Sequence, residues 1–102
     1  MEITFLGTYG WYSLKGQTAC VLVETKKTNF IFDAGTGISR LKEYLNVKKP
    51  TYLFITHFHL DRIVGLFCLF DAFKGKKVIV CGQRGMKRIL NDLMKKPLWP
   101  EQ

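Results

Sequence analysis

Five stretches of the chain have the pattern of β-strands. In each, apolar and polar residues alternate or apolar residues form a short run. The expected strands cover residues 2–6, 19–25, 30–32, 52–55 and 77–81. The first two are separated by a loop that contains Gly7, Gly10 and Gly16, and a polar turn at residues 26–29 leads into the third. The chain is therefore expected to begin as a β-meander. The run at residues 52–55, which ends at Thr56 and His57, is typical of a buried strand that leads into a site.

Helical spacing follows in other segments. Ile38, Leu41 and Leu45 share one helical face, with Thr36 or Ser39 as the expected cap. Near the end of the chain, apolar residues at i, i+3, i+4, i+7 and i+8 predict a helix that stops at Pro97. Its apolar positions are Met86, Ile89, Leu90, Leu93 and Met94.

Between these two segments the pattern is weaker. Asp61 is expected to cap a helical turn through Ile63, Val64 and Leu66, although Gly65 weakens it. Residues 66–73 are too uniformly apolar for periodicity to separate helix from loop, while residues 77–81 are expected to form another buried strand.

The composition fits a single domain over residues 1–102 with a small core, since 47% of the residues are apolar. No apolar run approaches the roughly 20 residues of a membrane-spanning helix, and the start lacks a basic signal-peptide region, so we expect no membrane association and a cytoplasmic location. Cys20, Cys68 and Cys81 are odd in number and lie in apolar runs, which favours reduced, buried thiols.

Sixteen Lys and Arg against eight Asp and Glu give a net charge of +8. A positive field of this size attracts phosphates or acidic partners. Much of the excess lies after residue 73, where a solvated face beside a strand and a helix is the simpler interpretation. No nucleic-acid-binding motif accompanies these residues.

The segment THFHLDR, residues 56–62, carries the candidate chemistry. In an extended loop, residues two apart point the same way, so His57, His59 and Asp61 can surround one small volume. Imidazole nitrogen and carboxylate oxygen suit zinc and, less selectively, iron or manganese, and catalytic zinc uses three protein ligands plus water. Alternatively, these are polar loop residues bonded to the backbone.

Three motifs in order, Leu-Gly-Thr-x-Gly from residue 6, Phe-Asp-Ala-Gly-Thr-Gly from residue 32 and the histidine segment, resemble the metallo-β-lactamase superfamily. The first motif resembles its ribonuclease Z and phosphodiesterase branch. The resemblance implies an α/β protein with a partial metallo-β-lactamase fold, in which mixed β-sheets with outer helices form part of an αββα-type sandwich. It covers nearly the whole chain as an N-terminal half, so the domain is expected to be truncated.

The family signature is HxHxDH, which assigns the first-metal ligands to His57 and His59 and the second-metal and water-handling role to Asp61. Arg62 replaces the last histidine and cannot ligate, because guanidinium stays protonated and has no free lone pair. It is expected to oppose a second ion, to pair with Asp61 or to hold a substrate phosphate, unless it points to solvent. Family members supply further ligands from later sequence, so at most one ion is expected. Asp33 and Thr56 are expected to support the ligands.

Two functions remain open. The first is a metal-dependent hydrolase in which Asp61 orients a water activated by zinc, manganese or iron, acting on a phosphodiester or another anionic ester, including a thioester. The alternative is a catalytically inactive homologue that binds nucleic acid or protein through Lys87, Arg88, Lys95 and Lys96. A homo-oligomer or a partner chain is also expected to cover the open sheet edge.

Overall fold

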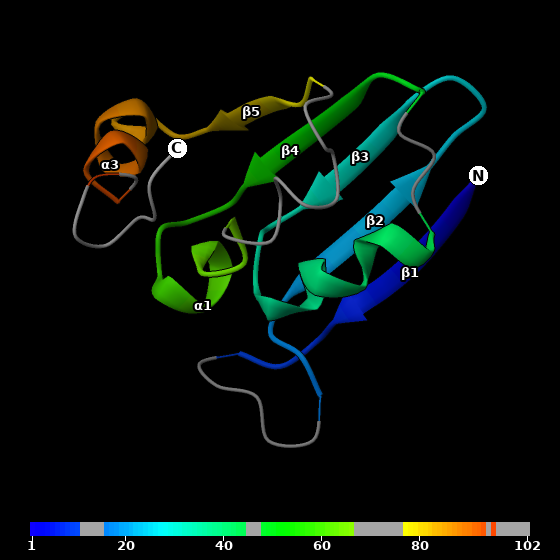
Figure 1. The fold of residues 1–102 in the computed structure, drawn as a ribbon, viewed down its shortest axis with the longest axis horizontal. Coiled ribbons are helices and arrows are strands. Elements are labelled where there is room, and N and C mark those ends of the chain that lie inside the picture. The colour runs from blue at the N-terminus through cyan, green and yellow to red at the C-terminus, as the bar shows by residue number, and fades with distance from the viewer. Residues whose placement is uncertain (11–15, 45–47, 67–76, 94, 96–102) are drawn as a thin grey trace.

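A computed structural model describes residues 1–10, 16–44, 48–66, 77–93 and 95 (Figure 1). The strands are β1 (Glu2–Gly7), β2 (Cys20–Glu24), β3 (Asn29–Phe32), β4 (Thr51–Ile55) and β5 (Ile79–Gly82). The helices are η1 (Thr36–Glu43), α1 (Leu60–Ile63) and α3 (Met86–Leu93). All five predicted strands are confirmed, with ends shifted by one or two residues.

The strands form one mixed sheet in the order β1-β2-β3-β4-β5. The pairs β1–β2 and β2–β3 are antiparallel, as expected for a meander, whereas β3–β4 and β4–β5 are parallel. Each parallel pair is joined by a crossover that contains a helix, since parallel neighbours cannot be linked by a tight hairpin. The carboxyl ends of β3, β4 and β5 consequently lie at the same end of the sheet (Figure 1).

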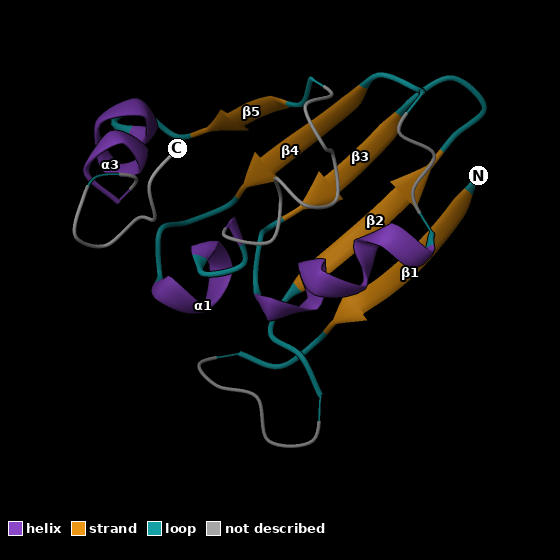
Figure 2. Ribbon diagram, in the orientation of Figure 1, coloured by secondary structure: helices purple, strands orange, loops and turns teal. Residues whose placement is uncertain are grey.

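Helix η1 covers one face of the sheet over β1 and β2, and α1 lies past the carboxyl ends of β3 and β4 (Figure 2). Leu22, Ile31 and Leu53 point to that face from neighbouring positions of β2, β3 and β4, and none is exposed. Ile38 and Leu41 of η1 pack on them and belong to the same buried cluster. The alternation along the strands therefore places the core on the face that the helices cover.

The opposite face is apolar as well. Its positions follow the strand register across all five strands: Ile3, Phe5, Val21, Val23, Phe30, Phe32, Tyr52, Phe54, Ile79 and Cys81. Phe30 stacks on Tyr52 at 5.9 Å and Phe32 stacks on Phe54 at 5.5 Å between ring centroids. We call this set the open face, because Phe5 remains 64% exposed and Ile3 54% exposed.

The helices depart from the sequence-based prediction in three details. The segment after residue 35 is a 3-10 helix, and neither Thr36 nor Ser39 caps it, since Gly35 holds the N-cap position without a side-chain bond. Asp61 does not cap α1 either, because His59 holds that position and Asp61 lies within the first turn. Leu45 and residues 67–76 fall outside the described residues.

The strand β5 is also less buried than predicted. It forms one edge of the sheet, and Ile79 is 40% exposed while Val80 and Cys81 are half-buried. Cys20 is completely buried, as expected of a structural thiol, and Cys68 lies outside the described residues. Among the described helices, none has the length and apolar character needed to cross a membrane.

Candidate metal centre

Two loops that follow parallel strands build the centre. Asp33 comes directly after β3, and the segment from Thr56 to His59 comes directly after β4. Asp33 adopts a positive φ of 66°, a conformation that aspartate tolerates better than most residues and that turns the chain sharply away from the strand. Its amide still donates to the carbonyl of Phe54, 2.8 Å away, so the turn remains tied to β4. Ligand sites in open α/β sheets lie outside such carboxyl ends.

The three predicted ligands come together. One ligand atom from each of His57, His59 and Asp61 lies within 4.8 Å of the others. The two imidazole rings are 4.6 Å apart, edge to face. His57 and Asp61 are half-buried, whereas His59 is exposed. Two imidazoles and a carboxylate are a donor set that suits zinc, so the residues present fit one divalent ion.

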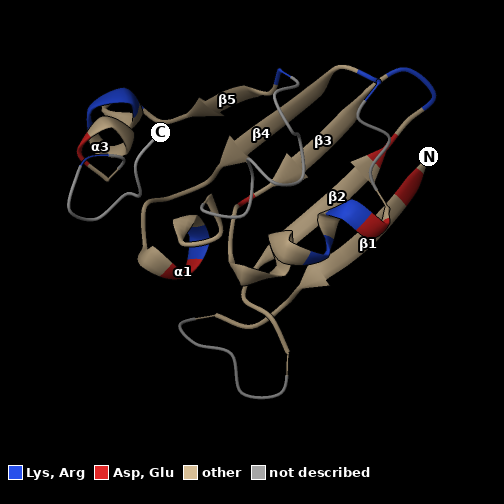
Figure 3. Ribbon diagram, in the orientation of Figure 1, with Lys and Arg blue, Asp and Glu red and all other residues tan. Residues whose placement is uncertain are grey.

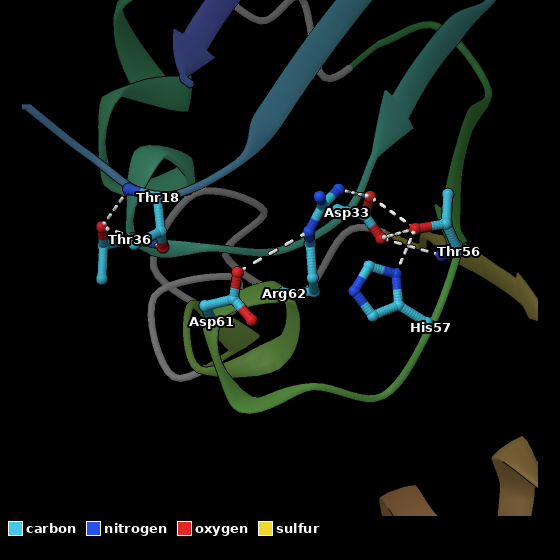
Figure 4. Close-up of polar contacts among 7 residues, drawn as sticks. All are labelled: Thr18, Asp33, Thr36, Thr56, His57, Asp61 and Arg62. Atoms are coloured by element: carbon cyan, nitrogen blue, oxygen red, sulfur yellow. Dashed lines mark hydrogen bonds and ion pairs between the residues drawn. The ribbon is translucent and has the colours of Figure 1, made fainter. Parts of the chain in front are cut away.

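Thr56 links His57 to Asp33 (Figure 4). The Thr56 hydroxyl lies 2.8 Å from Asp33 Oδ2 and 3.1 Å from His57 Nδ1, and the Thr56 amide donates to Asp33 Oδ1 at 2.8 Å. A carboxylate only accepts, so the single hydroxyl proton of Thr56 goes to Asp33. The hydroxyl oxygen must then accept from Nδ1–H of His57. This tautomer leaves Nε2 of His57 with a free lone pair, as a metal ligand requires.

Arg62 points inward rather than to solvent. Its Nη1 donates to Asp33 Oδ2 at 2.8 Å, and its Nε lies 3.7 Å from Asp61 Oδ2 (Figure 4). Only 31% of the Arg62 side chain is exposed, compared with 4% for Asp33. Nε is buried and has no hydrogen-bond partner among the described residues. The guanidinium charge of Arg62 thus lies between the carboxylate of Asp33 and that of Asp61, a predicted metal ligand.

The backbone of α1 packs tightly on the turn after β3. The Ala34 amide donates to the Arg62 carbonyl and the Gly65 amide donates to the Ala34 carbonyl, each at 2.7 Å. A Cβ atom at Gly65 would overlap the carbonyl oxygen of Gly35. Gly65, which weakens the helix as a sequence signal, is therefore required for close approach of the two segments.

Two further hydrogen-bonded contacts near the centre were not predicted from the sequence. Thr18 and Thr36 bond reciprocally, each amide donating to the other hydroxyl at 2.8 Å, which joins the loop before β2 to the start of η1. Gln83, directly after β5, donates from Nε2 to the Thr56 carbonyl at 2.7 Å. Gln83 could have been predicted near the centre, because it is a polar residue directly after β5, a strand parallel to β4.

Burial affects one nearby thiol. Loss of hydration inside the protein, with a smaller contribution from the negative charge of Asp33, raises the pKa of Cys20 from 9.0 to about 12. The thiol is therefore protonated near neutral pH and supplies neither a nucleophile nor a metal ligand.

The family model described as the metallo-beta-lactamase superfamily matches residues 14–84. Among curated proteins, the chain is 31% identical to a ribonuclease Z of Staphylococcus saprophyticus, over 93% of this chain and 35% of the relative. It is also 31% identical to a ribonuclease Z of Nanoarchaeum equitans, over 90% of this chain and 31% of the relative. The chain thus spans about a third of the length of these relatives.

Solved structures agree with the expected fold class. The short form of human tRNase Z superposes with a TM-score of 0.73 at 28% identity, covering 92% of this chain and 38% of that chain. The metallo-beta-lactamase fold protein YhfI from Bacillus subtilis superposes with a TM-score of 0.72 at 23% identity, covering 92% of this chain and 42% of its own. The predicted α/β, partial metallo-β-lactamase fold is confirmed.

Proposed function

Because this chain belongs to the metallo-beta-lactamase superfamily, we propose that His57, His59 and Asp61 bind one divalent metal ion and support hydrolysis of a phosphodiester in a nucleic acid. The convergence of their three ligand atoms within 4.8 Å is the observation that supports this proposal. Zinc suits the donor set best, with manganese or iron as alternatives.

The surrounding residues prepare this arrangement before any ion binds. Asp33 holds Thr56 through its amide and its hydroxyl, and Thr56 in turn keeps His57 in the tautomer with Nε2 free. The bound ion would supply a Lewis acid that lowers the pKa of a water molecule. Asp61, as a half-buried carboxylate, can accept a hydrogen bond from that water and orient it.

We propose a limit of one ion on the basis of Arg62. Its positively charged guanidinium lies 3.7 Å from Asp61 and 2.8 Å from Asp33. A second cation beside Asp61 would be repelled by this fixed charge. The same charge remains partly exposed and would attract a substrate phosphate, the other role predicted for Arg62.

An anionic nucleic-acid substrate agrees with two observations. The relatives reported above carry the names ribonuclease Z and tRNase Z. The net charge of +8 independently favours a polyanion over a neutral substrate. The proposed hydrolysis takes place at a centre to which this chain contributes His57, His59 and Asp61.

Two measurements on the purified chain test the proposal. Equilibrium dialysis with zinc, followed by elemental analysis, should give one ion per chain, and His57→Ala and His59→Ala should each abolish tight binding. The zinc- or manganese-loaded chain should hydrolyse bis(p-nitrophenyl) phosphate faster than the His57→Ala control. Absence of bound metal would overturn the proposed centre. One bound ion without hydrolysis above the control would overturn the catalytic part and favour the binding function.

A further inference from the structure

A group of basic side chains on α3 and in the turn before it follows closely on the strand next to the candidate centre. The strands β4 and β5 are parallel, so the loop that begins at Thr56 and the turn that begins at Gln83 leave the sheet at the same end. The hydrogen bond from Gln83 Nε2 to the Thr56 carbonyl, 2.7 Å long, joins the two segments directly. Helix α3 begins only three residues after Gln83, so its first turn follows closely on this contact.

The two sides of α3 differ in chemistry. Met86, Ile89, Leu90 and Leu93 follow helical spacing and are half-buried, and Leu90 and Leu93 pack against the core cluster. Lys87 and Arg88 lie on another side of α3, Arg84 lies in the turn before the helix, and all three residues are exposed. We call these three residues the α3 basic surface. The apolar contacts fix the orientation of the helix, so the surface is held outward by the fold.

Within the described part of the chain, no acidic side chain pairs with the α3 basic surface. Asp92, the acidic residue of α3, forms its ion pair with Lys95 at 3.3 Å instead. At the opposite end of the sheet, by contrast, Glu2 and Glu24 face each other across β1 and β2, and Lys26 and Lys27 follow β2 within three residues of Glu24. Figure 3 shows the acidic ends of β1 and β2 close to a basic loop.

We propose that the α3 basic surface binds the phosphate backbone of a single RNA strand and leads that strand to the centre at His57, His59 and Asp61. The inference rests on the proposed function and specifies its substrate-binding surface. Exposed cations without carboxylate partners bind a polyphosphate chain by releasing its counterions, and such binding needs no particular base sequence. The planar guanidinium groups of Arg84 and Arg88 can each bind a phosphate through two parallel hydrogen bonds.

The test measures RNA binding in the absence of hydrolysis. A fluorescein-labelled oligouridine is titrated with the His57→Ala chain in a chelator, and binding is followed by fluorescence anisotropy. In this background, Lys87→Glu/Arg88→Glu should weaken binding about tenfold or more at low salt. The matched control, Lys26→Glu/Lys27→Glu, changes the net charge equally at the far end of the sheet and should weaken binding clearly less at about 0.1 M salt, where the Debye length is about 10 Å.

Salt dependence and a second variant keep the result interpretable. The neutral variant Lys87→Gln/Arg88→Gln is first checked for folding by circular dichroism. It should make the slope of log K against log salt less negative by about 1.4, since each phosphate contact to a single strand contributes about −0.7. Equal weakening by both charge reversals, no weakening by either, or equally good competition by polyglutamate would overturn the inference. Because binding is read without metal, failure of hydrolysis alone would contradict the proposed function and leave this inference standing.

Discussion

The guanidinium of Arg62 and the carboxylate of Asp33 form an ion pair 2.8 Å long that joins α1 to the end of β3. Asp33 is almost completely buried and also accepts hydrogen bonds from both the amide and the hydroxyl of Thr56. This one carboxylate therefore connects the loop that carries the histidines, the turn after β3 and helix α1. The positive charge of Arg62 therefore partly neutralises the carboxylates of Asp33 and Asp61, whether or not a metal ion is bound.

Loss of this ion pair should destabilise the fold. Arg62→Gln removes the cation paired with the buried carboxylate of Asp33 and leaves it, among the described side chains, with Thr56. We expect the free energy of unfolding in urea to fall by about 1–3 kcal/mol. Lys95→Gln removes the exposed pair with Asp92, whose side chains are 68% and 64% exposed, and should cost less than about 0.5 kcal/mol. Equal changes in the free energy of unfolding for the two substitutions would show that the Arg62–Asp33 pair stabilises the fold no more than an exposed pair does.

Removal of the Thr56 hydroxyl should weaken metal binding. Thr56→Val keeps the shape of the side chain but frees the tautomer of His57, and we expect zinc affinity measured by calorimetry to fall about 10- to 100-fold. Thr56→Ser retains the hydroxyl and should restore most of the affinity. Unchanged binding by Thr56→Val would mean that His57 is oriented by other contacts.

A methyl group at Gly65 should disrupt the packing of α1. Its Cβ would overlap the Gly35 carbonyl and lie 2.7 Å from the Ala34 carbonyl, and both neighbours are backbone atoms that cannot rotate away. We expect Gly65→Ala to lower the free energy of unfolding by about 2 kcal/mol or more. Gly10→Ala, which meets nothing within 4 Å, should stay within about 0.5 kcal/mol of the parent.

Stability should fall at alkaline pH because of Cys20. Its pKa is raised to about 12, so between pH 9 and pH 12 the unfolded chain releases the thiol proton while the folded chain retains it. The unfolded state then binds fewer protons, and the free energy of unfolding decreases with pH by up to about 1.4 kcal/mol per pH unit. Cys20→Ala should lack this part of the slope. Parallel pH profiles for the two proteins would contradict the prediction.

The open face should cause self-association of the isolated chain. Contiguous apolar surface across five strands is unfavourable in water, and sedimentation velocity should show species larger than 11.8 kDa whose share grows with concentration. Phe5→Lys, at a position 64% exposed on this face, should shift the distribution toward monomer. Leu60→Lys, at an equally exposed position on α1, should not. A concentration-independent monomer for the parent chain would rule out this behaviour.

Much of the architecture was predictable because it depends on local pattern. Alternation and β-branched residues located all five strands. The ligand atoms of His57, His59 and Asp61 converge as predicted, although Asp61 lies in the first turn of α1 and not in an extended loop. The helix ends were less predictable. Thr36 looked like a cap, but its hydroxyl bonds to Thr18, a residue 18 positions earlier that sequence proximity does not reveal.

The sequence by itself thus determined the strands, the family and the candidate ligands, since each follows from short-range periodicity or from motifs in order. Only the tertiary structure decided that Arg62 turns inward to Asp33, that Gln83 meets the metal loop, and which apolar face of the sheet the helices cover. Both faces of β3 and β4 are apolar, so pattern alone cannot choose between them. That choice follows from where the crossovers dock η1 and α1, through contacts between residues far apart in the chain.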